Sequence, residues 1–175
     1  MSLPSWASSL QQTLNRLSEE RPLRLAVLGI GHELRGDDAV GLAVVAGLRP
    51  YLQARAEPFM RDNFLLIEAA HAPENHTGTI RKFRPTLVLL VDAAQMNEPP
   101  GTVSWLQPQQ MTGLSASTHT MPPTLLMRFL QAELGCAVAF LGIQPADTTL
   151  GAGLSAVVQT AVVTIIQTIK DTLLN

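Results

Sequence analysis

Residues 86–92 have the sequence TLVLLVD, in which five consecutive apolar residues end at an aspartate. A short apolar run of this kind is typical of a strand that is buried on both faces of a parallel sheet. Similar runs occur at 23–29 (LRLAVLG), 64–68 (FLLIE) and 137–142 (AVAFLG), and residues 102–106 are predicted to form an edge strand. The sequence therefore predicts five strands.

Helical periodicity separates these runs. Apolar residues recur at three- and four-residue steps in the segments 4–19, 38–52, 122–134 and 154–173, which predicts an amphipathic helix in each. The segment 71–84 carries turn residues and is expected to hold one or two helical turns. Strands that alternate with helices predict an α/β fold with a mostly parallel central sheet.

The composition limits the class of protein. The chain has 175 residues, 46% of them hydrophobic and 15% charged, which is enough apolar content for one folded domain and argues against disorder. We expect residues 1–22 to form an N-terminal helical extension and residues 23–175 to form a single α/β domain. The net charge of −2 gives no global attraction to nucleic acid.

Cysteine content and hydropathy predict the compartment. A single cysteine, Cys136, excludes an intramolecular disulfide framework and a cysteine-rich zinc module. A buried, inert thiol is the favoured interpretation of that residue. The apolar stretch 154–169 is interrupted by glutamine and threonine, so we expect a buried helix, no membrane insertion and a cytoplasmic protein.

Polar residues that follow the predicted strands are the candidates for chemistry, because open α/β sheets bind ligands at the carboxyl ends of their strands. Asp37 and Asp38 follow the first strand, Asp92 ends the third, and His119 lies in the loop before the helix at 122–134. Burial of a carboxylate at Asp92 is costly unless it has a partner, which could be a cation or backbone N–H groups. One residue of the Asp37–Asp38 pair is expected to cap the following helix.

Two carboxylates and an imidazole can bind a zinc or nickel ion and leave one of its coordination positions open. Asp38, Asp92 and His119 are therefore a candidate metal site, although an exposed loop histidine and two structural carboxylates remain the alternative. Residues 71–76 include two histidines and Glu74, for which a solvated loop is the favoured interpretation. The sequence contains no complete GxGxxG, because Leu34 replaces the third glycine, and no GxxxxGK[ST], HExxH or GxSxG motif.

Four segments of the sequence resemble the [NiFe]-hydrogenase maturation endopeptidases, and most closely the type that serves the hydrogenase of formate hydrogenlyase. These segments are LAVLGIGHELRGDDAVG (25–41), HAPENHTGTIRKFRPTLVLLVDAAQM (71–96), THTMPPTLL (118–126) and FLGIQP (140–145). Their order and spacing match the family along most of residues 23–174.

The resemblance implies a three-layer fold with a twisted, mostly parallel five-stranded sheet and helices on both faces. It also implies an endopeptidase that removes the C-terminal extension of the nickel-loaded hydrogenase large-subunit precursor. The metal-binding and catalytic positions of the family fall on Asp38, Asp92 and His119. The cofactor implied is a nickel ion that the substrate presents, for which other divalent ions can substitute, and the partner is the precursor.

Two departures from the family pattern affect this interpretation. The family has Gly-Asn after the first strand, where this chain has Gly31-His32, so His32 could add a ligand or simply occupy the turn. The second strand of the family ends in Asp-Gly-Gly, where this chain has Glu68-Ala69-Ala70. The departures leave a non-catalytic, metal-dependent binding protein or chaperone for the precursor as the alternative function.

Overall fold

The computed structural model describes residues 4–54, 63–111, 115–116 and 121–174. The strands are β1 (Leu25–Ile30), β2 (Phe64–Ala70), β3 (Leu87–Gln95), β4 (Val103–Leu106), β5 (Ser115–Ala116) and β6 (Ala137–Ile143). The α-helices are α1 (Ser5–Glu20), α2 (Val40–Ala54), α4 (Thr77–Phe83), α5 (Pro123–Leu134) and α6 (Ala156–Leu174). The described residues also form three short 3-10 helices, which are η1 (Gly36–Ala39), η2 (Pro73–His76) and η3 (Pro108–Gln110).

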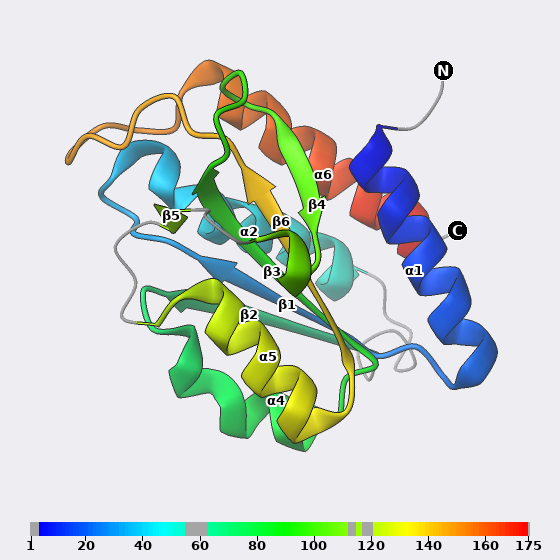
Figure 1. Ribbon diagram of the computed structural model, residues 1–175. Coiled ribbons are helices and arrows are strands. Elements are labelled where there is room, and N and C mark those ends of the chain that lie inside the picture. Colours follow the sequence, from blue (N-terminus) through cyan, green and yellow to red (C-terminus); the bar gives the residue numbers. More distant parts are fainter. Residues whose placement is uncertain (1–3, 55–62, 112–114, 117–120, 175) are drawn as a thin grey trace.

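The sheet has the strand order β2-β1-β3-β6-β4 (Figure 1). The pairs β1–β2, β1–β3 and β3–β6 are parallel, and β4 pairs antiparallel with β6 at the edge. The two-residue strand β5, which lies in the predicted loop 107–121, pairs antiparallel with the end of β3. The five predicted strands and the mostly parallel α/β fold are thus confirmed.

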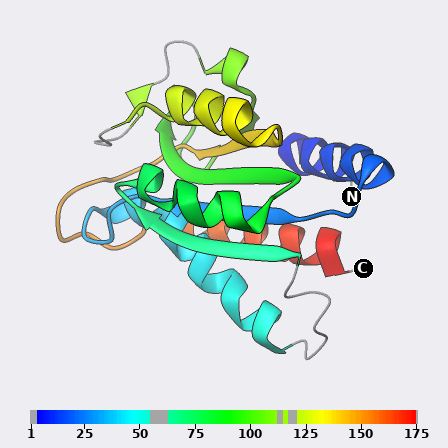
Figure 2. The ribbon, with the colours of Figure 1, turned by 90° about the horizontal axis from the view of Figure 1, so that it is seen from below.

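Two apolar layers cover the sheet, one on each face. The side chains of α1, α2 and α6 pack with one face of β1, β3 and β6, and those of α4 and α5 pack with the other face. Figure 2 shows α2 and α6 on one side of the strands and α5 on the opposite side. All six residues of β1 are buried, as are eight of the nine in β3, which explains why these strands are continuous apolar runs.

Helix α1 is amphipathic, as its spacing predicted. Trp6, Ala7, Leu10, Leu14 and Leu17 are buried and belong to the same apolar cluster as α2 and α6. The helix lies against β4, the edge strand, whose Trp105 packs on that cluster. Helix α1 therefore contributes directly to the core on this face of the sheet.

Some element boundaries differ from the sequence-based expectation, whereas the helical turns expected in the segment 71–84 are present. The helix expected at 38–52 begins with a 3-10 turn, and its regular part starts at Val40. Strand β3 continues past Asp92 as far as Gln95, because the residues after the aspartate still pair with β6 and β5. The segment 71–84 forms η2 and the two-turn helix α4. Within the described residues, no helix has the length and hydropathy to cross a membrane.

Candidate functional site

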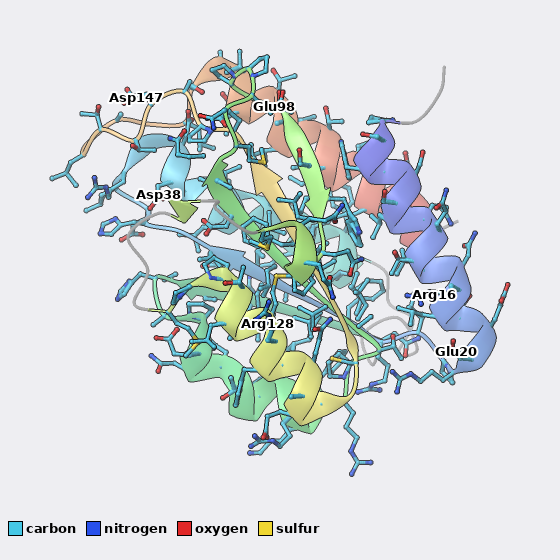
Figure 3. The ribbon with its side chains drawn as sticks, viewed as in Figure 1. Arg16, Glu20, Asp38, Glu98, Arg128 and Asp147 are labelled. Atoms are coloured by element: carbon cyan, nitrogen blue, oxygen red, sulfur yellow. The ribbon has the colours of Figure 1, made fainter. Side chains whose placement is uncertain are left out.

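The carboxyl ends of β1, β2, β3 and β6 lie at one edge of the sheet, because these strands are parallel. The loop after β1, the turn η2 after β2 and the loop between β6 and α6 all begin at this edge. Figure 3 shows Asp38 and Asp147, from two of these loops, at the same end of the molecule. This is the edge at which an open α/β sheet binds its ligands.

Glycines bring the start of α2 into direct contact with the strand ends. A Cβ atom at Gly41 would overlap the carbonyl oxygens of Ile30 and Val91, and one at Gly31 would overlap the carbonyl oxygen of Asp38. Gly31 has a φ of 139°, which glycine adopts without strain. These contacts hold the backbone of Asp38 against the end of β1 and hold α2 against the residue that precedes Asp92.

Asp37 is fully buried and holds two loops together. Its carboxylate accepts hydrogen bonds from the N–H groups of Ala146 (2.8 Å), Asp147 (3.0 Å) and Ser155 (2.7 Å). The Ser155 hydroxyl donates a fourth bond at 2.9 Å. The prediction that one residue of the pair caps the following helix does not apply to Asp37, because its bonds come from the loop that leads into α6.

The environment of Asp37 also lowers its pKa. Burial by itself would raise the pKa of this carboxyl group, since it removes water from the charged form. The hydrogen bonds from Asp147, Ser155 and Ala146 favour the charged form more strongly, and the net pKa lies below the ordinary value of 3.8. Asp37 is therefore an ionised structural residue.

Asp38 has the opposite surroundings. It is 2% exposed, and its buried Oδ2 atom has no hydrogen-bond partner among the residues that the structure describes. A buried carboxylate oxygen of this kind costs free energy unless a cation or a donor reaches it. Carboxylate oxygens are suitable ligands for a divalent ion. The Oδ2 atom of Asp38 therefore has the chemistry required of the metal ligand predicted at this position.

Asp92 lies on β3, opposite Gly142 of β6, and is fully buried. It comes directly after Val91, against which the start of α2 packs, so the fold brings Asp38 and Asp92 to the same edge of the sheet. The third predicted ligand, His119, lies outside the described residues. Within the described ranges, no three His, Cys, Asp or Glu side chains meet in a metal-binding cluster.

The residues at the two departures from the family pattern have local partners. The Nδ1 atom of His32 accepts a hydrogen bond from the N–H group of Leu34 at 3.2 Å, as a turn residue does. Glu68 forms an ion pair with Arg49 of α2 at 3.1 Å, on the surface. Ala70 has a φ of 50°, which is the left-handed conformation that favours glycine.

Glu74 of η2 is a residue that the sequence analysis did not select. Its side chain is half-buried, and within the described segments its buried Oε2 atom has no hydrogen-bond partner. The turn follows β2 at the same sheet edge as Asp38. Nothing in the local sequence distinguishes this glutamate from a solvated one, because its burial arises from the packing of η2 on β2 and α4.

Cys136 is confirmed as a buried free thiol. Burial raises the pKa of this thiol above its ordinary value of 9.0. A thiol with a raised pKa is largely protonated at neutral pH and is a poor nucleophile. The cysteine therefore belongs to the apolar core next to α5 and has no catalytic features.

The comparisons with known proteins agree on one family. Residues 47–172 match the family model HycI, hydrogenase maturation protease. The hydrogenase 3 maturation protease of Escherichia coli K12 is 34% identical over 120 residues, which are 68% of this chain and 71% of that protein.

Solved structures give the same result over a larger part of the chain. The crystal structure of the [NiFe] hydrogenase maturation protease HycI from Thermococcus kodakarensis superposes with a TM-score of 0.80 at 26% identity. The match covers 95% of this chain and 99% of that one. A crystal structure of hydrogenase 3 maturation protease has a TM-score of 0.68 and 31% identity, and the match covers 83% of this chain and 88% of that one. This chain therefore belongs to the hydrogenase maturation protease family.

Proposed function

We propose that this protein is the endopeptidase that removes the C-terminal extension from the nickel-loaded large-subunit precursor of a [NiFe] hydrogenase. Membership of the hydrogenase maturation protease family supports the reaction class and the kind of substrate. The single observation that carries the proposal is the buried Asp38 carboxylate, whose Oδ2 atom has no hydrogen-bond partner in the part of the chain that the structure describes. That oxygen is available to a group that the precursor supplies.

Asp38 and Asp92 supply two buried carboxylates at the sheet edge, and His119 is proposed as the third ligand. Nickel enters as part of the substrate, and three protein ligands leave a coordination position for the precursor. A nickel ion held in this way would polarise the scissile carbonyl or lower the pKa of the attacking water. Cleavage would then depend on earlier insertion of nickel, which makes the metal a test of maturation.

The protein itself contributes position and charge. The glycine contacts at Gly31 and Gly41 fix the backbone of Asp38 against the strand ends, and a fixed carboxylate loses little entropy when the substrate binds. Among the described residues no group occupies the Oδ2 atom of Asp38, so this oxygen is free for the role of a general base toward the attacking water. We therefore assign one of two roles to Asp38: it orients the metal, or it accepts a proton from the attacking water. In either role Asp38 acts on the substrate side of the sheet edge.

A nucleotide-binding function has less support. The glycine-rich turn after β1 is filled by another part of this chain. The N–H group of Gly36 donates to the carbonyl of Ala152 at 3.1 Å, and that of Asp37 donates to the carbonyl of Asp147 at 2.8 Å. A phosphate group needs such N–H groups, and here they already have partners.

The test is incubation of the purified protein with nickel-loaded and nickel-free precursor, followed by intact mass analysis. We expect a shortened precursor only in the nickel-loaded sample. Asp38→Asn, Asp92→Asn and His119→Ala should each reduce processing strongly while circular dichroism stays unchanged. Asp171→Asn is the matched control, because Asp171 is exposed on α6 and bonds only to Gln167 among the described residues.

Two results would contradict the proposal. If the wild-type protein binds the nickel-loaded precursor but does not shorten it, the protein is a metal-dependent binding protein. If all three site variants retain full activity, the assigned site is wrong. The free, buried thiol of Cys136 suits a reducing compartment, and we place the reaction in the cytoplasm.

A further inference from the structure

A polar groove lies between α1 and the segment that includes β4 and η3. It has a volume of about 430 Å³ and is lined by Thr13 and Arg16 of α1, by Trp105 of β4, and by Gln107 and Gln110. Figure 1 shows α1 beside β4 at the side of the sheet. Arg16 lies far across the molecule from Asp38 in Figure 3, so the groove is separate from the carboxyl edge of the sheet.

The two glutamines present hydrogen-bond donors to this groove. They form a capping box around η3, in which the Gln107 side chain accepts from the N–H group of Gln110. The Oε1 atom of Gln110 in turn accepts from the N–H group of Gln107 at 2.8 Å. Both amide oxygens are thus engaged by backbone donors, which also fixes the orientation of each amide. In the described part of the chain the NH₂ groups of the two side chains have no acceptor and can contact a ligand.

Arg16 adds a positive charge to the same groove. Its side chain is exposed, and within the described residues the ion pairs are Arg49–Glu68 and Arg81–Glu133. Glu19 and Glu20 follow Arg16 at helical spacing but do not approach it within ion-pair distance. A guanidinium presents a planar set of donors that matches a carboxylate.

Trp105 supplies an apolar surface next to these donors. The residue is half-buried, and it packs against the core cluster below α1 while it also lines the groove. Strand β4 pairs with β6 on one side and is the last strand in the sheet order. Helix α1 packs against β4, so the groove is recognised by side chains, and the indole offers a rigid surface to a bound peptide.

We propose that this groove binds a carboxylate-bearing segment of a peptide or protein partner, with Arg16 and the NH₂ groups of Gln107 and Gln110 as donors to the carboxylate. A peptide fits better than free phosphate, because the groove has one cation, a large volume and an aromatic wall. The proposal does not depend on proteolysis, since the groove lies away from Asp38.

The experiment is a titration of the whole protein, labelled with ¹⁵N, with an acetylated and amidated hexapeptide that carries one aspartate and one glutamate. The protein has two tryptophans, and we expect the indole resonance of Trp105 to shift while that of the buried Trp6 stays constant. Arg16→Gln should weaken binding about tenfold, which corresponds to the loss of one charge-assisted hydrogen-bond pair. Arg128→Gln on α5 (Figure 3) is the matched control and should leave binding unchanged.

Three outcomes would overturn the proposal. The first is equal binding of a peptide in which asparagine and glutamine replace the two acids. The second is an equal loss of affinity in Arg16→Gln and Arg128→Gln, which would indicate a general effect of charge. The third is a Trp105 shift that inorganic phosphate alone reproduces at the same concentration. Both arginines are exposed, so both variants are expected to fold, and their thermal melting points verify this.

Discussion

Asp37 and Asp38 are adjacent in the chain, but their carboxylates have opposite environments. Asp37 accepts four hydrogen bonds from the loop before α6. Asp38 has a buried Oδ2 atom to which no group in the described ranges donates a hydrogen bond. The same chemical change, Asp to Asn, should therefore have opposite effects on stability at the two positions.

Asp37→Asn should lower the free energy of unfolding by about 2 to 3 kcal/mol, because bonds to a charged acceptor are lost and an amide NH₂ group faces backbone donors. The lowered pKa of Asp37 adds a pH dependence. Its stabilising contribution is present above the ordinary value of 3.8 and is lost as the pH falls through the lowered folded-state pKa. Urea unfolding at several pH values should show this decrease in the free energy of unfolding at acid pH in the wild-type protein, and a smaller decrease in Asp37→Asn.

Asp38→Asn should raise the free energy of unfolding by about 1 kcal/mol, because it removes a buried carboxylate whose Oδ2 atom has no hydrogen-bond partner among the described residues. The same substitution should abolish cleavage of the precursor, as functional carboxylates are often retained at the expense of stability. Urea unfolding of the metal-free protein measures the first effect. A loss of stability as large as that of Asp37→Asn would show that Asp38 is a structural residue.

At the scale of single elements, the end of β2 is held in a conformation that its sequence does not favour. Ala70 has a φ of 50°, and its carbonyl accepts a hydrogen bond from the N–H group of Gly31 at 2.9 Å. Ala70→Gly should stabilise the protein by about 1 kcal/mol, since glycine adopts this conformation without strain.

The control for that substitution is Ala69→Gly, at a buried neighbour without a positive φ. Glycine there should destabilise the protein, because the unfolded chain gains freedom and a buried methyl group is lost. Thermal unfolding of the two variants should give shifts of opposite sign. Shifts of the same sign would show that the backbone at Ala70 is not strained.

Helix α1 is the second element whose contribution can be measured. Leu10 is 1% exposed and packs in the same cluster as α2 and α6. Leu10→Ala should reduce the free energy of unfolding by about 2 to 5 kcal/mol, as for other buried leucines, in a single cooperative transition. Glu19→Ala, on the exposed side, should change it by less than about 0.5 kcal/mol. An effect of Leu10→Ala as small as that of Glu19→Ala would indicate a helix that is only loosely attached.

At the scale of the whole molecule, the contact between α2 and the sheet sets the position of Asp38 relative to Asp92. Gly41 contacts Ile30 of β1 and Val91 of β3, and the strand residue Gly29 contacts Gly41 in turn. A side chain at Gly41 would push α2 away from the strands and would move Asp38 relative to Asp92. Packing between these layers therefore sets the geometry of the site.

Gly41→Ala should destabilise the protein by about 3 kcal/mol or more, because the new methyl group meets backbone atoms that cannot turn aside. Cleavage of the precursor should fall further than the folded fraction accounts for. Gly78→Ala in α4 is the control, since open space surrounds that position, and alanine there should be neutral or stabilising. Wild-type activity per folded molecule in Gly41→Ala would contradict the proposed link between packing and site geometry.

The sequence by itself determined the main helices, the five longer strands and the class of fold, whereas β5 lies in a predicted loop. The apolar runs at 25–30 and 87–91 identify buried strands because both faces of a parallel strand are covered. The helical spacing of Trp6, Leu10 and Leu14 likewise predicted the buried face of α1. These patterns are local, so they can be recognised without knowledge of the contacts between distant segments.

Only the tertiary structure decided which polar residues have partners. The partners of Asp37 are more than one hundred residues away in the chain, and the burial of Glu74 depends on how η2 packs. The strand order and the donor-rich groove beside α1 also depend on contacts between distant segments. A buried polar group is stabilised only if a hydrogen-bond donor or acceptor lies next to it in space. Local sequence does not specify that neighbour, because it comes from a distant segment.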